Sequence, residues 1–238
     1  MPYAIIQLPN KKFSVVNRIS GHQFSSGSTK AKAAAQMRLL QMKAKKMEGG
    51  SLLVGGTAGD SLLHKSMSDK DLQEYFPNAK IIKYNELPRE VPADEFLKKV
   101  GDVVFILYEA EENVGHWTCL ARAPDCFFYF DSYGNKPDVP LEWNSKETNE
   151  RLGQSVPLLT KMFFLTKQPV YYNNYDYQSK KDTEMATCGR WATSFLIHFK
   201  KYGGSLKSFR TEVAKQSKAK HLPMDNLIAT KIKGDKTL

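Results

Sequence analysis

The chain has 238 residues, of which 41% are hydrophobic, and its net charge is +10. This length and apolar content allow one large buried core and exclude an intrinsically disordered chain. No apolar run reaches roughly 18 residues and Met1–Gln7 lacks the features of a signal peptide, so we expect a soluble protein with no membrane partner. The positive charge predicts a polyanionic partner such as nucleic acid, or a lysine-rich surface that only keeps the protein in solution.

The cysteines are few and unevenly spaced: Cys119, Cys126 and Cys188. An odd number in a long chain argues against a disulfide framework and for a reducing compartment. Because no two of them form a Cys-x-x-Cys pair, we also expect no structural metal site.

The N-terminal stretch is expected to form a hairpin and a basic helix. Residues 12–17 and 21–24 flank the turn-prone Arg18–Ser20, which is typical of a hairpin. Residues 30 to about 47 have an apolar stripe at helical spacing, made of Ala31, Ala34, Ala35, Leu39 and Met42. The helix also carries candidate nucleic-acid-binding residues: Lys30, Lys32, Arg38, Lys43, Lys45 and Lys46. Lys215, Lys218 and Lys220 form a second basic group, and a solubilising helix face is the alternative for the first.

A glycine-rich stretch then separates two parts of the chain. Residues 48–59 contain five of the fifteen glycines, which is typical of a flexible junction. We therefore expect a small N-terminal unit over residues 1–50 and a main domain over residues 51–238. Gly50 and Gly56 end Gly-Gly pairs that a protease could cleave, although a plain linker explains them equally.

The main domain is predicted to alternate helices and strands. Ser68 and Asp71 resemble a capping box that opens a short helix through Tyr75. The remaining predictions, in chain order, are a strand at 81–84, a helix at 94–100, strands at 103–108, 116–122 and 126–131, helices within 145–165 broken near Pro157, a strand at 170–172, and helices from 188 and over 205–216. Val103–Tyr108 is apolar throughout, which favours a central strand covered on both faces.

A histidine and an aspartate are expected to meet at the open end of one hairpin. The turn-prone Ala123–Asp125 joins the strands at 116–122 and 126–131, so His116 and Asp131 should lie opposite each other. Directly opposed side chains are about 4.5–5.5 Å apart at Cβ, close enough for a carboxylate to orient an imidazole.

A lone cysteine opens the helix that we expect from residue 188. Thr187 is a plausible N-cap, and the positive end of the helix dipole favours the thiolate of Cys188. Gly189 would let a substrate backbone approach closely. Together with His116 as base, Asp131 as orienting group and the Gln178 amide as oxyanion donor, Cys188 completes the groups that a cysteine hydrolase needs.

The ordered set Gly115-His116-Trp117, Phe130–Gly134, Gln178 and Thr187–Trp191 resembles the cysteine proteases related to the adenovirus maturation protease and the SUMO-deconjugating enzymes. The N-terminal hairpin and helix look like those of maturation proteases from large DNA viruses and virophages. The resemblance implies that Cys188 is the nucleophile, His116 the base, Asp131 its orienter and Gln178 the oxyanion donor, with Trp117 and Gly189 beside the substrate. Gln178 is further from Cys188 in sequence than the family usually shows, so Asn173 or Asn174 could replace it.

The resemblance implies an α+β fold of the papain-like, adenovirus-protease type, with a central mixed sheet and the nucleophile on a buried helix N-terminus. It also implies a viral maturation protease that cleaves capsid or core precursors after Gly-Gly, in the virion or at the cytoplasmic or nuclear assembly site. No cofactor is expected, apart from DNA as an activator. The alternatives are a deconjugating protease for ubiquitin-like modifiers, an inactive nucleic-acid-binding virion protein, and an acyltransferase.

Overall fold

The computed structural model describes residues 3–17, 23–24, 27–47, 62–179 and 185–233. Its strands are β1 Tyr3–Gln7, β2 Phe13–Asn17, β3 Lys80–Lys83, β4 Val103–Glu111, β5 Val114–Arg122, β6 Phe127–Asp131 and β7 Val170–Tyr172. Its α-helices are α1 Lys30–Met47, α3 Asp69–Tyr75, α4 Ala93–Phe96, α5 Lys146–Arg151, α6 Leu158–Leu165, α7 Cys188–Tyr202, α8 Leu206–Lys220 and α9 Met224–Lys231. Two short 3-10 helices are η1 Tyr84–Glu86 and η2 Val139–Trp143.

A five-stranded mixed sheet organises the main part of the chain. The strand order is β3-β4-β5-β6-β7. The inner pairs β4–β5 and β5–β6 are antiparallel, while the outer strands β3 and β7 run parallel to their neighbours. The prediction of an α+β fold with a central mixed sheet is therefore confirmed.

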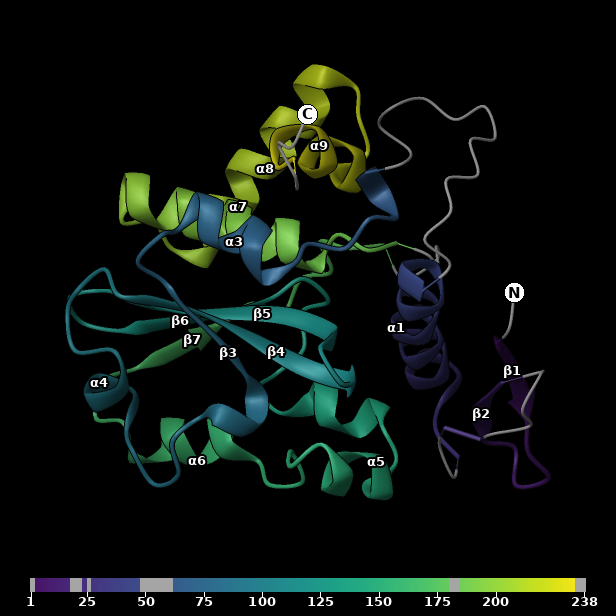
Figure 1. The fold of residues 1–238 in the computed structure, drawn as a ribbon. Helices are drawn as coiled ribbons and strands as arrows, with labels where there is room; N and C mark the ends of the chain where they lie inside the picture. The colour runs from purple at the N-terminus through teal and green to yellow at the C-terminus, as the bar shows by residue number, and fades with distance from the viewer. Residues whose placement is uncertain (1–2, 18–22, 25–26, 48–61, 180–184, 234–238) are drawn as a thin grey trace.

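Helices cover both faces of this sheet, with α3, α7, α8 and α9 on one side and α4, α5 and α6 on the other (Figure 1). Alternate residues of β4 point to opposite faces, as strand geometry requires. Phe105 and Leu107 join the core under α7, whereas Val104 and Ile106 join the core over α6. The expectation of a central strand buried on both faces is confirmed.

Most of the predicted helices and strands are present. The capping box of α3 is complete, because Ser68 Oγ accepts from the Asp71 N–H and Asp71 accepts from the Ser68 N–H. The region before and after Pro157 forms α5 and α6, and α8 extends beyond the predicted end to Lys220. The predicted helix at 94–100 is shorter, since α4 ends at Phe96. Helices α9 and η2 were not predicted from the sequence pattern.

The N-terminal hairpin is not the one that the sequence predicted. β2 pairs with the earlier strand β1, in the register Ile5↔Val15, rather than with residues 21–24. In the described part of the later segment, Gln23 forms an isolated bridge with Val16. Starting the hairpin at residue 12 overlooked Tyr3–Gln7, whose short apolar run provides the partner strand.

Helix α1 is present where it was predicted, but it buries a different face. Ala33, Gln36 and Leu40 are buried, together with Ala35 and Arg38, whereas Ala31 is exposed. The side chains of Leu39 and Met42 lie outside the described residues. The glycine-rich junction, with Gly50, Gly56 and the predicted domain boundary, also lies outside the described residues. Within the part of the chain that the structure describes, no helix is long and apolar enough to cross a membrane.

Candidate active site

Cys188 is the first residue of α7, and its side chain is buried on the sheet side of that helix. Trp191 and Phe195 continue the same apolar face and pack in the core with β5 and β6, which fixes the helix against the sheet. Thr187 precedes the helix as predicted, but its hydroxyl does not cap it. Thr187 Oγ1 instead donates to Asp225 Oδ1 of α9 at 2.6 Å.

His116 and Asp131 meet as predicted, although the register between their strands differs by two residues. Asp131 pairs with Thr118, not His116, because the turn between β5 and β6 is centred one position later, with the Ala123 N–H bonded to Cys126 O. A shift of two residues keeps both side chains on the same face of the sheet, whereas a shift of one would have separated them. His116 Nε2 and Asp131 Oδ1 are 3.0 Å apart, and both residues are fully buried.

Two aromatic rings hold the His116 imidazole. The Tyr133 ring stacks on it with centroids 5.2 Å apart, and the Trp143 ring packs at 5.1 Å with a tilt of 59°. The Asp131 carboxylate is held as well, because Oδ1 also accepts from the Tyr133 N–H and Oδ2 accepts from Asn135 Nδ2. These contacts restrict rotation of the ring and leave its Nδ1 directed away from Asp131. The role of Trp143 could not be predicted, because nothing local in the sequence connects η2 to β5.

The electrostatics of His116 and Cys188 favour a charged pair. Burial opposes the charge on His116, but the charge of Asp131, its hydrogen bond and the Cys188 thiol raise the pKa of the imidazole to about 10. Nδ1 is buried and bonds no other described residue, so it is available to the thiol. Burial would raise the pKa of Cys188, but the hydrogen bond and charge of His116 and the backbone N–H groups of Trp117 and Gly189 lower it below its ordinary value.

The pKa values of the other two cysteine thiols shift in the opposite direction, upward. Cys119 is fully buried, and burial raises the pKa of its thiol well above the ordinary value. Burial and the neighbouring Asp125 also raise the pKa of Cys126, which is partly exposed. Cys188 is therefore the only one of the three whose thiolate is favoured.

This contrast predicts the order in which the cysteines react. At neutral pH, iodoacetamide should modify Cys188 before the more exposed Cys126, because only the thiolate reacts. Peptide mass mapping at short reaction times would measure the order. Earlier modification of Cys126 would show that exposure, not thiolate character, controls reactivity in this protein.

Gln178 lies beside the segment that leads into α7. Its amide oxygen accepts from Ser132 Oγ at 2.9 Å, and its Nε2 donates to Met185 O at 3.0 Å. An amide nitrogen has two hydrogens, so one remains for a further acceptor. Its role as the oxyanion donor stays a prediction.

Asn173, the alternative to Gln178, already has other partners. Its amide oxygen accepts from the Asp131 N–H, and its Nδ2 donates to Asp131 O and Tyr175 O. Asn173 thus holds the backbone that carries Asp131. Asn174 is exposed, and no contact connects it with Cys188 among the described residues.

Trp117 and Gly189 pack against each other and not around an open groove. Trp117 is 5% exposed, and its indole N–H donates to Met67 O at 3.1 Å. A Cβ at position 189 would lie 3.0 Å from Met67 Cβ and 3.2 Å from Trp117 Cδ1. Glycine at position 189 therefore lets Met67 and Trp117 pack closely, and its place beside a substrate backbone stays a prediction.

The candidate nucleic-acid-binding residues do not form one exposed surface. Arg38 is 2% exposed, so its assignment to a DNA-binding face is wrong. Lys32 forms an ion pair with Glu142 of η2, whereas Lys30 is exposed. The side chains of Lys43, Lys45 and Lys46 lie outside the described residues, so DNA binding by this helix stays a prediction.

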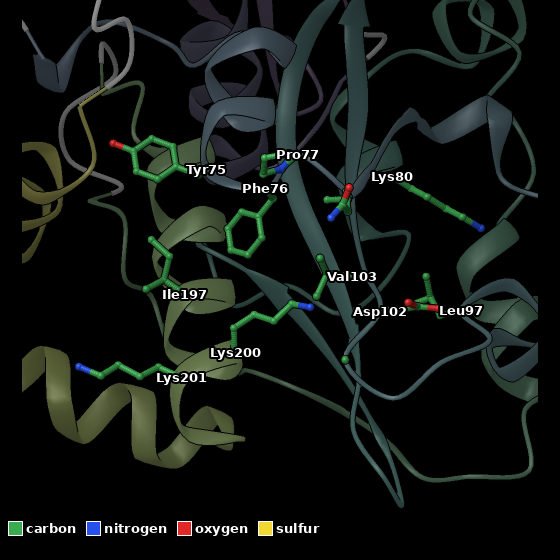
Figure 2. A pocket seen from close by; sticks show the side chains of 13 residues that line it. Tyr75, Phe76, Pro77, Lys80, Leu97, Asp102, Val103, Ile197, Lys200 and Lys201 are labelled. Carbon is green, nitrogen blue, oxygen red and sulfur yellow. The ribbon is translucent and has the colours of Figure 1, made fainter.

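A separate pocket of about 580 Å³ lies between the end of α3, the start of β3 and the second half of α7. Figure 2 shows Phe76, Val103 and Ile197 among its apolar lining and Lys200 and Lys201 among its basic lining. None of the candidate catalytic residues lines it. Among the described residues, no group of three or more His, Cys, Asp or Glu side chains is placed to hold a metal ion.

Comparison with known proteins gives a family but no activity. No family model matches the chain. Protein V9 of Sputnik virophage, which is uncharacterized, is 32% identical over 153 residues, covering 60% of this chain and 86% of V9. The chain belongs to the family of virophage protein V9.

Two solved structures of proteases show distant likenesses to this V9-family chain. A crystal structure of the ASFV pS273R protease matches 77% of this chain and 76% of its own, with 12% identity and a TM-score of 0.37. A crystal structure of a de-sumoylating protease matches 97% and 92%, with 10% identity and a TM-score of 0.25. At TM-scores this low, neither likeness carries an argument about the activity of this chain.

Proposed function

We propose that this V9-family chain is a cysteine endopeptidase that cleaves virion precursor proteins. The observation that carries the proposal is the arrangement of Asp131, His116 and Cys188. Asp131 Oδ1 lies 3.0 Å from Nε2 of His116, whose ring packs against Tyr133 and Trp143. Nδ1 of the same ring is therefore left for the Cys188 thiol at the start of α7, whose pKa is lowered. Nucleophile, base and orienting carboxylate are the three groups that cysteine hydrolases combine.

The reaction would proceed through a thioester. The Cys188 thiolate attacks the scissile carbonyl carbon, and the new C–S bond moves the carbonyl electrons onto oxygen. The remaining amide hydrogen of Gln178 and the Gly189 N–H would donate to that oxyanion. As the C–N bond breaks, protonated His116 gives its Nδ1 proton to the leaving amine. His116 then accepts a proton from water, whose oxygen attacks the thioester and releases the acid and the thiolate.

Burial of the nucleophile supports a substrate with small side chains at the cleavage site. Cys188 is 2% exposed and belongs to the same core cluster as Trp117 and Met67, so only a slender backbone segment would reach its sulfur. Two glycines before the scissile bond satisfy this requirement. The motif resemblance to adenovirus-type maturation proteases points to the same specificity and to capsid or core precursors as substrates.

A peptide library derived from a cell proteome tests the proposal without assuming a substrate. Wild type should cut peptides after Gly-Gly, and Cys188→Ala should cut none of them. Virophage capsid precursors should then yield new N-termini directly after Gly-Gly sequences. If the wild type cuts no more of the library than Cys188→Ala does, peptidase activity is rejected. Cleavage of a ubiquitin-like precursor but not of capsid precursors would favour the deconjugating alternative.

A further inference from the structure

Arg38 of α1 is a charged residue buried at the edge of the proposed active site. A buried guanidinium is unfavourable unless its N–H groups and charge find partners. Its Nε donates to Ala34 O of the same helix at 3.2 Å, and its Nη1 donates to Ser179 O at 3.3 Å. Its Cζ lies 5.0 Å from the centroid of the Tyr133 ring. Across the described ranges no carboxylate forms an ion pair with Arg38, so its contacts point to the site and not to a surface acid.

Both distant contacts of Arg38 lead to groups of the site. Ser179 directly follows Gln178, the candidate oxyanion donor. The Tyr133 ring that Arg38 contacts also stacks on His116, with centroids 5.2 Å apart. Helix α1 also packs against β4, against β5, which carries His116, and against η2, which carries Trp143.

Ser179 is held from two sides by elements far apart in the sequence. Its carbonyl accepts from Arg38 of α1, and its N–H donates to Asp225 Oδ2 of α9 at 2.8 Å. Just before it, the N–H groups of Tyr177 and Gln178 donate to Ser132 O at 2.9 and 3.0 Å. Among the described residues, Arg38, Asp225 and Ser132 thus anchor the backbone around Gln178, and Arg38 supplies the anchor that comes from the N-terminal part of the chain.

We propose that Arg38 is a positioning residue that holds the Gln178–Ser179 backbone, so that helix α1 completes the oxyanion side of the active site. This inference rests on the proposed function for its effect on catalysis, but its effect on the backbone is independent of any activity. Arg38 touches neither Cys188 nor the reacting atoms. A displacement of an oxyanion donor by about 1 Å can lower the rate by up to a hundredfold, so the loss of the Arg38 anchor should have a measurable effect.

The kinetic test compares Arg38→Met with Arg151→Met, which replaces an exposed arginine of α5 outside the proposed site. Methionine keeps much of the length of arginine but cannot donate to Ser179 O. We expect kcat per titrated thiol to fall about tenfold with KM changed less than about twofold, since the oxyanion forms only during the reaction. Alkylation of Cys188 by iodoacetamide, which forms no oxyanion, should keep its rate. Arg38→Lys should recover part of kcat, and Arg151→Met should behave as wild type.

A double-mutant cycle asks whether Arg38 acts through Gln178. In the Gln178→Ala background, Arg38→Met should reduce kcat little further, because the donor that Arg38 positions is already gone. Equal losses in both backgrounds would overturn the assignment to the oxyanion side. An unchanged kcat in Arg38→Met would overturn a positioning role altogether.

Amide hydrogen exchange gives a readout that needs no turnover. In a Cys188→Ala background, Arg38→Met should speed exchange in the segment 175–179 and leave α7 unchanged. Faster exchange throughout the protein, or no local change, would overturn the inference even if the wild type proves to be an active protease. If the wild type cleaves nothing, the proposed function fails, and the exchange experiment still decides whether Arg38 holds this segment. Should Arg38→Met fail to fold, the same comparison with Arg38→Lys decides.

Discussion

Replacing Cys188 by alanine, or His116 by alanine, is expected to lower peptide turnover by a factor on the order of 10⁵ or more. The nucleophile and its base act as one unit, so the loss of either one removes almost the whole advantage of the pair. The kcat on the best library peptide, per mole of folded protein, measures the effect. Both single variants and the double variant should have nearly the same residual rate.

A matched control is available in Cys119, which is also buried and also packs under α7. Its Sγ lies 3.8 Å from Ala192 O, and burial raises the pKa of its thiol, so it has no part in the proposed chemistry. Cys119→Ala should therefore retain near wild-type turnover. Thermal melting must accompany these variants, because His116→Ala leaves a cavity between Tyr133 and Trp143. A folded Cys188→Ala variant with substantial turnover would contradict the assignment of the nucleophile.

The sequence predicted the placement of the catalytic groups because that placement depends on local periodicity. Apolar runs and one turn-prone segment predict the strand Val103–Tyr108 and the hairpin that follows it. Side chains alternate between the two faces of a strand, so moving the turn by one position shifts the register by two residues and keeps His116 and Asp131 on the same face. The apolar spacing after Cys188 likewise fixes which side of α7 faces the sheet.

The supporting groups could not be predicted in the same way, because they come from elements that meet only in the folded chain. Trp143 of η2 reaches His116, and Asp225 of α9 binds Thr187 Oγ1, Trp191 Nε1 and the Ser179 N–H. Neither element has a strong periodic signal. A buried aspartate with three donors is visible in a sequence only as one acidic residue among 25 acidic residues.

Arg38 shows how a composition argument can mislead. Six basic residues in one helix suggested a polyanion-binding face, yet one of them is buried against Tyr133 and Ser179. The charges in a sequence predict the sign of a helix surface, but they do not predict how the helix is rotated about its own axis. The rotation of α1 follows from its contacts with β4, β5 and η2, which lie far away in the sequence.

Asp131→Asn should lower turnover roughly a thousandfold while the protein stays folded. Asparagine is nearly the same size and can still accept from His116 Nε2, so the orientation of the ring is partly kept. It lacks the charge, which is the main contribution that raises the pKa of His116 to about 10. Without that charge the pKa of the imidazole should fall toward its ordinary value, and the positive charge that favours the Cys188 thiolate is weakened.

The pH dependence of Cys188 alkylation separates this effect from simple loss of structure. In the wild type the thiolate is lost only when the pH falls through the lowered pKa of Cys188, and the imidazolium beside it persists until the pH approaches about 10. In Asp131→Asn the inflection of the alkylation rate should move to higher pH, so the rate at neutral pH should fall. Asn135→Ala, which removes one hydrogen bond to Asp131 Oδ2 but not its charge, should leave the inflection near that of the wild type. An Asp131→Asn profile that coincides with the wild-type profile would mean that Asp131 orients the ring without charging it.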